Sequence, residues 1–129
     1  MDRSHLLRAL ALAALVVSAT PAAACMSDKS DDAAAEGRLS ISNAQDAAGR
    51  PQRPYILILA APACLSSDDP DGRVDQSPTI HVFSSDEAIH VRLSKLVGRA
   101  IRVRGRPFAA HTAHHHAPIV MDIATITVP

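Results

Sequence analysis

Four of the seven histidines in this chain lie within six residues, at His111, His114, His115 and His116 in the run HTAHHHAP. Imidazole is the commonest protein ligand for transition metals, and it changes charge near neutral pH. If two or three of these rings converge, they could bind Zn²⁺ or Cu²⁺. Two other interpretations fit the same residues. The rings could hydrogen-bond backbone groups in a turn before Pro118, with one ring packed on the protein, or they could form a pH-sensitive contact. Three further residues could serve as metal ligands, although no sequence spacing typical of a metal site connects them to the cluster: His81, His90 and Asp122.

A second candidate site is a row of arginines, Arg102, Arg104 and Arg106, which alternation along a strand places on one face. A basic row on a β-barrel would ordinarily indicate nucleic acid. The chain has only three aromatic residues and no tryptophan, however, and the binding of single strands depends on aromatic stacking. We therefore expect no nucleic acid partner. One interpretation of the row is a binding face for an anionic ligand or for an unknown envelope protein. The other is a solvated face whose arginines pair with neighbouring acids.

The sequence carries no recognised catalytic motif. It has no GxSxG, no HExxH and no glycine loop of the type that cradles phosphate. The formal net charge is zero, which gives no general attraction toward nucleic acid or membranes. These observations predict a non-enzymatic binding or interaction module of unknown ligand. The alternative is a periplasmic transition-metal-binding protein that uses the cluster from His111 to His116.

The N-terminus has the pattern of a secretory signal peptide. Arg3 and Arg8 precede an apolar run over 9–19, and the small residues Ala22 and Ala24 form a cleavage site, so the leader is expected to span 1–24. The apolar run is too short to cross a bilayer as a helix. The pattern predicts a periplasmic or secreted protein.

Cys25 and Cys64 are the two cysteines of the chain, and both follow the predicted leader. In an oxidising compartment two cysteines usually form a disulfide. A cysteine directly at the cleavage point can instead be lipidated, which would anchor the protein in the membrane through Cys25. Ala22 stands where a lipidation signal usually has leucine, so the disulfide is favoured and lipidation remains the alternative.

The remaining sequence predicts one domain with β-rich structure. The segment 25–36 is polar and alanine-rich without a strand pattern, and we expect it to be flexible. Over 37–129, strands are predicted at 37–42, 55–59, 79–83, 100–104 and 119–128, with loops at 43–54 and 66–78. A helix is predicted over 85–97, with Ser84 and Glu87 as a capping box and Gly98 as its stop.

This order of elements predicts an all-β fold with one helix, namely a small five-stranded OB-like barrel whose helix lies between strands three and four. Closing the sheet would remove its exposed edges. The alternative is an open antiparallel sheet with one helix packed on it.

The last third of the chain contains the run LVGR at 96–99, VRG at 103–105, Phe108, and HTAHHHAPIV at 111–120. In these residues it resembles a family of small exported bacterial proteins with a TGHHHTPV-like signature, the domain of unknown function 4431 family. Ala113 and Ala117 stand where the family usually has glycine and threonine. Tyr55–Leu57, Pro62–Cys64 and Cys25 resemble its middle strand and its two cysteines. The resemblance implies export, a disulfide and this fold, and it implies no activity.

Overall fold

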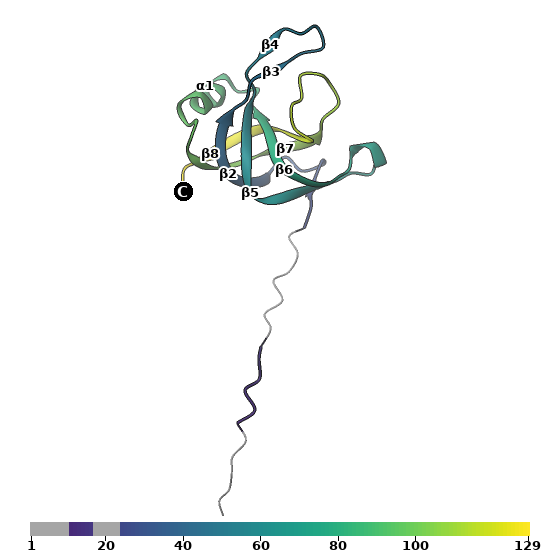
Figure 1. Cartoon of the computed structure of the whole chain (residues 1–129), viewed down its shortest axis with the longest axis vertical. Helices are drawn as coiled ribbons and strands as arrows, with labels where there is room; N and C mark the ends of the chain where they lie inside the picture. The colour runs from purple at the N-terminus through teal and green to yellow at the C-terminus, as the bar shows by residue number, and fades with distance from the viewer. Residues whose placement is uncertain (1–10, 17–23) are drawn as a thin grey trace, which may run out of the picture.

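The computed structural model describes residues 11–16 and 24–129. Most of the predicted signal peptide lies outside the described residues. The folded part is a closed barrel of five strands (Figure 1). These strands are β2 (Ala33–Ile41), β5 (Tyr55–Ser66), β6 (Val74–Phe83), β7 (Ala100–Ala109) and β8 (Ile119–Thr127).

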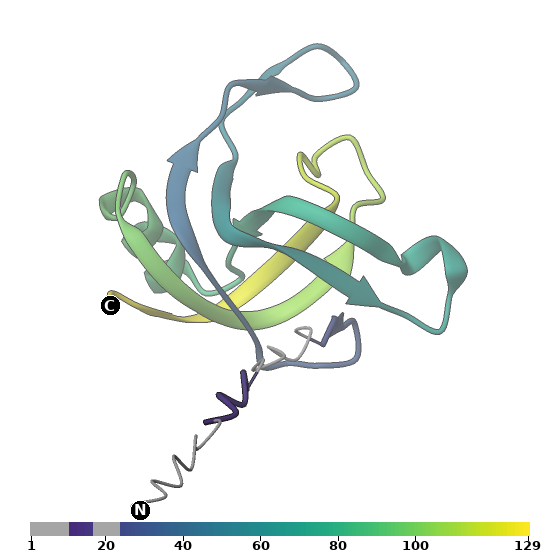
Figure 2. The same ribbon diagram turned by 60° about the horizontal axis from the view of Figure 1, so that its bottom comes forward.

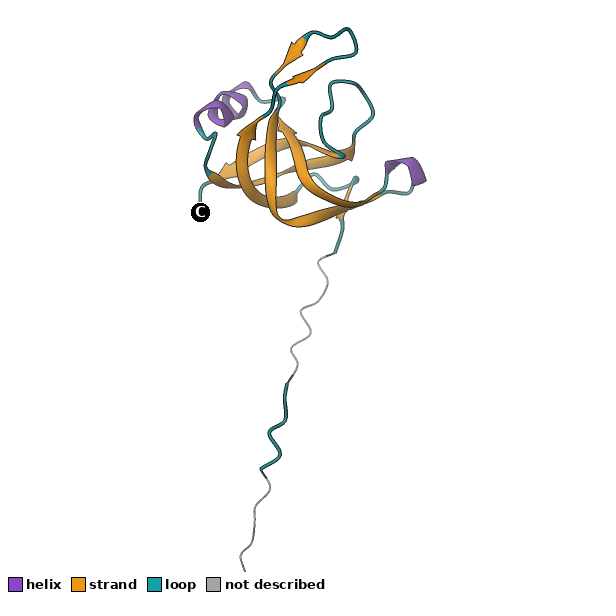
Figure 3. Cartoon of the chain, in the orientation of Figure 1, coloured by secondary structure: helices purple, strands orange, loops and turns teal. Residues whose placement is uncertain are grey.

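The barrel closes because β5 pairs with two neighbours. The strand order is β5–β2–β7–β8–β6, and β6 then pairs with β5 again. Every pair in this ring is antiparallel except β6–β8, which is parallel. In the chain, the helix α1 (Glu87–Lys95) connects the third barrel strand, β6, to the fourth, β7, and it lies beside the barrel (Figure 3). The predicted OB-like barrel is therefore confirmed, and the open sheet is wrong.

Alternation along the strands fills the barrel interior with aliphatic side chains. Leu39, Leu57, Ile80, Ile101 and Met121 are each fully buried in one cluster. Each comes from a different strand, so the core holds all five strands together. Burying each such side chain stabilises the fold by about 2 kcal/mol before entropy is counted.

Two glycines let the sheet curve closely enough to close. A Cβ on Gly37 would lie 2.2 Å from the carbonyl oxygen of Ile58, and one on Gly105 would lie 2.1 Å from that of Asp122. The β7–β8 register also shifts between Arg104 and Gly105. Gly105 thus lies at a β-bulge, and such bulges bend strands into barrels.

The helix begins later than the sequence predicted. Asp86 is its N-cap, and the Asp86 carboxylate accepts hydrogen bonds from the backbone N–H groups of Ala88 (2.9 Å) and Ile89 (3.4 Å). The Ser84 hydroxyl, the predicted cap, instead donates to the carbonyl of Ile123 in β8 at 2.7 Å. The predicted capping box is therefore wrong, because Ser84 fastens the chain to the barrel before the helix begins.

The segment 25–36 contains strands, so the prediction that it has none is wrong. Met26–Ser27 form β1, which pairs in parallel with the end of β5. Ala33 to Glu36 are the first residues of β2 and pair with β7. Alanine gives no apolar–polar alternation for sequence reasoning to find. Here the backbone partners on β7 determine the strand.

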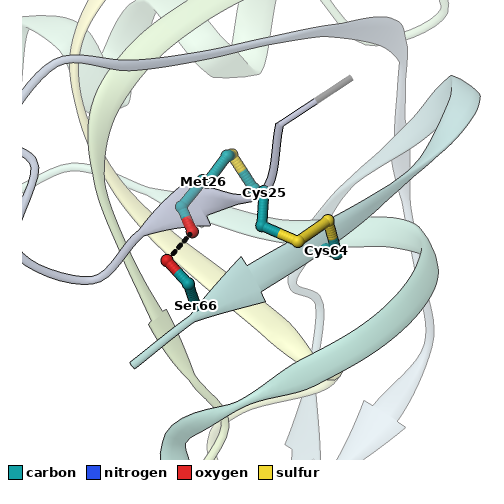
Figure 4. Close-up of a disulfide and its surroundings, with 4 residues drawn as sticks. All are labelled: Cys25, Met26, Cys64 and Ser66. Carbon is teal, nitrogen blue, oxygen red and sulfur yellow. Dashed lines mark hydrogen bonds between the residues drawn. A yellow bond between two sulfur atoms is a disulfide. The ribbon is translucent and has the colours of Figure 1, made fainter. Parts of the chain in front are cut away.

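A disulfide between Cys25 and Cys64 fastens this N-terminal segment to β5 (Figure 4). Beside it, the Ser66 hydroxyl donates to the carbonyl of Met26 at 3.1 Å. The bond joins residues 39 apart, and closing a loop of that length stabilises the fold by roughly 4 kcal/mol at most. Because the Cys25 sulfur is bonded to Cys64, it is not available for lipidation.

The barrel strands β5 and β6 are longer than predicted and form a protruding hairpin (Figure 2). The loop predicted at 66–78 is shorter in the structure, and it contains a single 3₁₀ turn at Pro70–Gly72, capped by Asp69. The predicted loop at 43–54 contains its own short hairpin, formed by β3 (Ala44–Gln45) and β4 (Pro51–Gln52). Within the described residues, no helix has the length and apolar character needed to cross a membrane.

Candidate functional site

The histidine-rich loop, residues 110–118, lies at the same end of the barrel as the β3–β4 hairpin (Figures 1 and 2). It connects β7 to β8, and its ends are joined by a 3.0 Å hydrogen bond from the Ala110 N–H to the Pro118 carbonyl. The hairpin connects β2 to β5. Two connections far apart in the sequence therefore meet at one rim.

Inside the histidine-rich loop, the His115 ring organises the turn. Its Nδ1 accepts hydrogen bonds from the backbone N–H groups of His111 (3.0 Å) and Thr112 (3.3 Å). The His115 N–H donates to the Thr112 carbonyl at 3.1 Å. The ring accepts hydrogen bonds from two amides that have no other partner within the described residues.

A second imidazole fastens the loop from the barrel side. His81 on β6 accepts the backbone N–H of His116 at its Nδ1, at 3.2 Å. With His115, this confirms the interpretation in which histidines hold a turn before Pro118 and pack on the barrel. The sequence suggests His81 only as a further metal ligand, and no sequence pattern indicates that its ring holds the loop.

Six rings form a continuous layer outside the barrel, which we call the ring cluster. The centroids of neighbouring rings in this cluster lie between 4.7 and 6.4 Å apart. Its members are His81, Phe83, Phe108, His111, His115 and His116. Val120 lies directly opposite both His81 and Phe108 in the sheet and is fully buried, although it is not part of the central core. The loop therefore covers a small second apolar layer.

Gln52 of β4 connects the hairpin to the histidine-rich loop. Its Oε1 lies 2.6 Å from His116 Nε2, and its Nε2 lies 2.6 Å from His114 Nδ1. Since an amide oxygen only accepts and an amide nitrogen only donates, His116 carries a proton on Nε2 and His114 accepts at Nδ1. One side chain thus determines the tautomer or donor role of two imidazoles.

Asp46 shapes the hairpin that presents Gln52. Its carboxylate accepts from the backbone N–H groups of Ala48 and Arg50, both at 2.9 Å, and from Arg50 Nε at 2.7 Å. The backbone N–H of Arg50 is the largest cause that lowers the pKa of Asp46. Gly49 takes the positive φ of 76° that the tip requires.

Between the hairpin and the loop lies a shallow depression of about 330 Å³, which we call the rim depression. It is lined by Gln52, Arg53, Pro54, His81, His114 and His116. Burial, followed by the nearby His116 and His115, lowers the pKa of His81 to about 4. Burial is also the main cause that lowers the pKa of His115, ahead of the neighbouring histidines. The His81 ring is therefore neutral at pH 7, and the neutral form of His115 is favoured.

The four predicted histidines do not converge on one point. His111 and His115 pack together against Phe108, whereas His114 and His116 meet at Gln52. Across residues 11–16 and 24–129, no group of three or more His, Cys, Asp or Glu is arranged to hold a metal ion.

The other two suggested ligands lie elsewhere in the fold and have contacts of their own. The His90 ring packs edge-on against Tyr55, at 5.8 Å between centroids. The Asp122 carboxylate accepts from the N–H and the hydroxyl of Ser85, at 3.0 and 2.6 Å.

The arginine row is mostly paired with acids on neighbouring residues of the sheet. Arg102 makes two contacts with Glu36, at 2.8 and 3.2 Å, and Arg104 contacts Asp32 at 3.3 Å. Arg106 is exposed and makes no ion pair within the described part of the chain. Two of the three arginines thus fit the solvated, paired face.

Sequence reasoning missed Gln52 and Arg53. Both lie in a stretch predicted only as a loop, and neither belongs to a motif. Their position beside the histidines arises from the curvature of the barrel, so no local signal could have found them.

The fold and rim define a small, disulfide-bonded OB-like barrel module. Residues 79–127 match the family model described as Domain of unknown function (DUF4431). The matched segment runs from the second half of β6 through β8 and includes the histidine-rich loop, and this match confirms the predicted resemblance. No match was found among curated proteins or among solved structures.

Proposed function

We propose that this protein is an exported, non-enzymatic binding module whose ligand occupies the rim depression. The observation that carries this proposal is the pair of hydrogen bonds by which Gln52 joins His114 and His116. OB-fold barrels bind ligands at the loops between their first and second strands and between their fourth and fifth strands. In this chain those two connections are the β3–β4 hairpin and the histidine-rich loop. The Gln52 bridge makes them one surface.

Export is supported by the disulfide together with the leader pattern of the sequence. Disulfides persist in oxidising compartments such as the periplasm and the extracellular space. The bond between Cys25 and Cys64 indicates a location outside the reducing cytoplasm. A periplasmic or secreted location is the finer form of the proposal.

A binding role is supported by the chemistry of the lining residues. None of the six is a serine, cysteine or carboxylate, so the depression offers no nucleophile paired with a base. The Nδ1 atoms of His81 and His114 already accept hydrogen bonds from within the protein. The arrangement suits recognition better than acid–base catalysis.

The test is a binding map made with isotope-labelled protein without its leader. Low-mass envelope extract and purified envelope proteins are added separately, and backbone and imidazole NMR signals are followed. We expect shifts centred on Gln52, Arg53, His81 and His114. Shifts confined to another face, or no shifts in any fraction, would overturn the proposal.

The same preparation tests the metal-binding alternative. Zn²⁺ or Cu²⁺ is titrated into the wild-type protein and into the His114→Ala/His116→Ala double variant. Stoichiometric binding that the double variant loses would replace the proposed function with metal binding. Unchanged thermal stability with either ion counts against that alternative.

A further inference from the structure

We propose that the rim depression recognises an oxyanion group, held by the Arg53 guanidinium and by the imidazole N–H groups of His81 and His114. The inference rests on the proposed function, because it names the chemistry that the same depression would select. Carboxylate, sulfate and phosphate groups share this chemistry.

The first argument is the charge of the lining. Arg53 is exposed, and within the described residues it makes no ion pair. No acidic side chain lines the depression. The Asp46 carboxylate lies near His114, but it is already bound by Arg50 Nε and by two backbone N–H groups. Within the described residues, a guanidinium without an ion-pair partner therefore lies beside the rings of His81 and His114.

The second argument is the position of the imidazole protons. The Nδ1 of His81 accepts the His116 N–H, and the Nδ1 of His114 accepts the Gln52 amide. A neutral imidazole has one proton, so both rings must carry it on Nε2. Neither Nε2 has a hydrogen-bond partner among the described residues. The atoms left for a ligand are thus donors.

These donors distinguish an anion from a metal ion. A metal needs the imidazole lone pair, and in His81 and His114 that lone pair on Nδ1 already accepts a hydrogen bond from within the protein. Free N–H donors beside a guanidinium instead match the oxygens of a negatively charged group, where charge-assisted hydrogen bonds are strongest. The lone pair of His116 Nδ1 has no partner in the described residues and can accept from the hydroxyl of a protonated oxyanion.

The experiment follows the histidine ring nitrogens by long-range ¹H–¹⁵N NMR at pH 7. Sodium sulfate, phosphate and acetate are titrated in separate arms, with sodium chloride balancing the ionic strength. We expect saturable shifts of the His81 and His114 Nε2–H groups. The Kd should lie in the millimolar range, which corresponds to a binding free energy of about 4 kcal/mol and is reasonable for a small exposed site. The arm with the lowest Kd identifies the preferred oxyanion.

Two arginine variants decide whether the depression is responsible. Arg53→Gln should weaken the binding by about tenfold, because a charge-assisted hydrogen bond is worth 1.5 kcal/mol or more. Arg106→Gln, which removes an exposed and equally unpaired arginine away from the rim depression, should leave the Kd unchanged. Both positions are exposed, so both variants are expected to fold, and their thermal unfolding confirms this.

Two outcomes would overturn the inference. One is the absence of saturable shifts with all three oxyanions, and the other is equal binding by Arg53→Gln and wild type. If an envelope fraction still perturbs the rim in either case, the proposed binding function stands while the oxyanion chemistry fails. If neither an oxyanion nor any fraction perturbs the rim, both are wrong.

Discussion

The barrel interior and the rim are held together by different physical means. The interior is aliphatic and fully buried, and its cohesion depends on excluding water from residues such as Leu57 and Ile80. The rim is built from rings and amides, in which His81, His115 and Gln52 each make hydrogen bonds to the loop. The stability of the interior should therefore depend on the volume of its buried side chains. The stability of the rim should depend on the protonation of its imidazoles and on single hydrogen bonds.

The largest expected effect lies in the interior. Leu57→Ala should lower the free energy of unfolding by about 3 kcal/mol, because it removes a fully buried side chain and leaves a cavity. The matched control is Ile58→Ala on the same strand, where the native side chain is 49% exposed and the loss should stay below about 1 kcal/mol. Urea denaturation measures both. Equal losses would contradict the view that the interior alone depends on volume.

The next effect is a loss of stability on acidification, which belongs to the rim. The pKa of His81 is about 4 in the folded protein, below its ordinary 6.5, so the unfolded chain binds a proton in this window and the folded chain does not. His81 therefore contributes its full stability above about pH 6.5 and loses it as the pH falls toward 4. Because solvent screens a half-buried ring, we expect acidification to lower the free energy of unfolding by about 1 to 2 kcal/mol through His81. His115, whose pKa is also lowered, acts in the same direction.

His81→Asn isolates this effect in the same urea experiment, repeated between pH 7 and 4. The asparagine oxygen can accept the His116 N–H without titrating, so the variant should lose less stability on acidification than wild type. The rings of His115 and His116 and the charge of Arg53 surround this position and remain in both proteins. Identical pH profiles would show that His81 is not the titrating group.

The smallest effect is expected from breaking the bridge between the hairpin and the loop. Gln52→Ala removes hydrogen bonds to His114 and His116 and should destabilise the fold by about 1 kcal/mol. Amide hydrogen exchange should quicken at residues 110–118 and stay unchanged in β2, β5 and β7. Gln45→Ala on the same hairpin, where the side chain is exposed, serves as the control. Faster exchange throughout the barrel would refute the separation of rim and interior.

Sequence patterns predicted the barrel well, because each barrel strand except the first part of β2 carries apolar residues in a local arrangement. The alternation at 100–104 and the continuous apolar run at 55–59 directly indicate strands that face a core. Strand lengths were underestimated in β5 and β6, whose outer halves are mostly exposed and pair with each other and with the short β1. Ala33–Glu36 escaped notice because alanine has no face preference, and the β7 backbone decides its conformation.

The candidate site was predicted only in part. The histidine run and its role in holding a turn could be inferred from composition and from the proline that follows. The contribution of His81, 35 residues before His116, could not, and neither could that of Gln52, which lies 62 residues from His114. Such contacts depend on where closure of the barrel brings distant loops.

The sequence by itself determined the five barrel strands in outline, their order, the two cysteines and the concentration of imidazoles before the last strand, because these follow from local residue types. Only the tertiary structure decided which imidazole atoms accept and which donate, since that depends on partners brought together by closure of the sheet. His81, His114 and His115, which read as metal ligands along the chain, instead accept hydrogen bonds from the protein at Nδ1. This leaves N–H donors and one arginine at the rim.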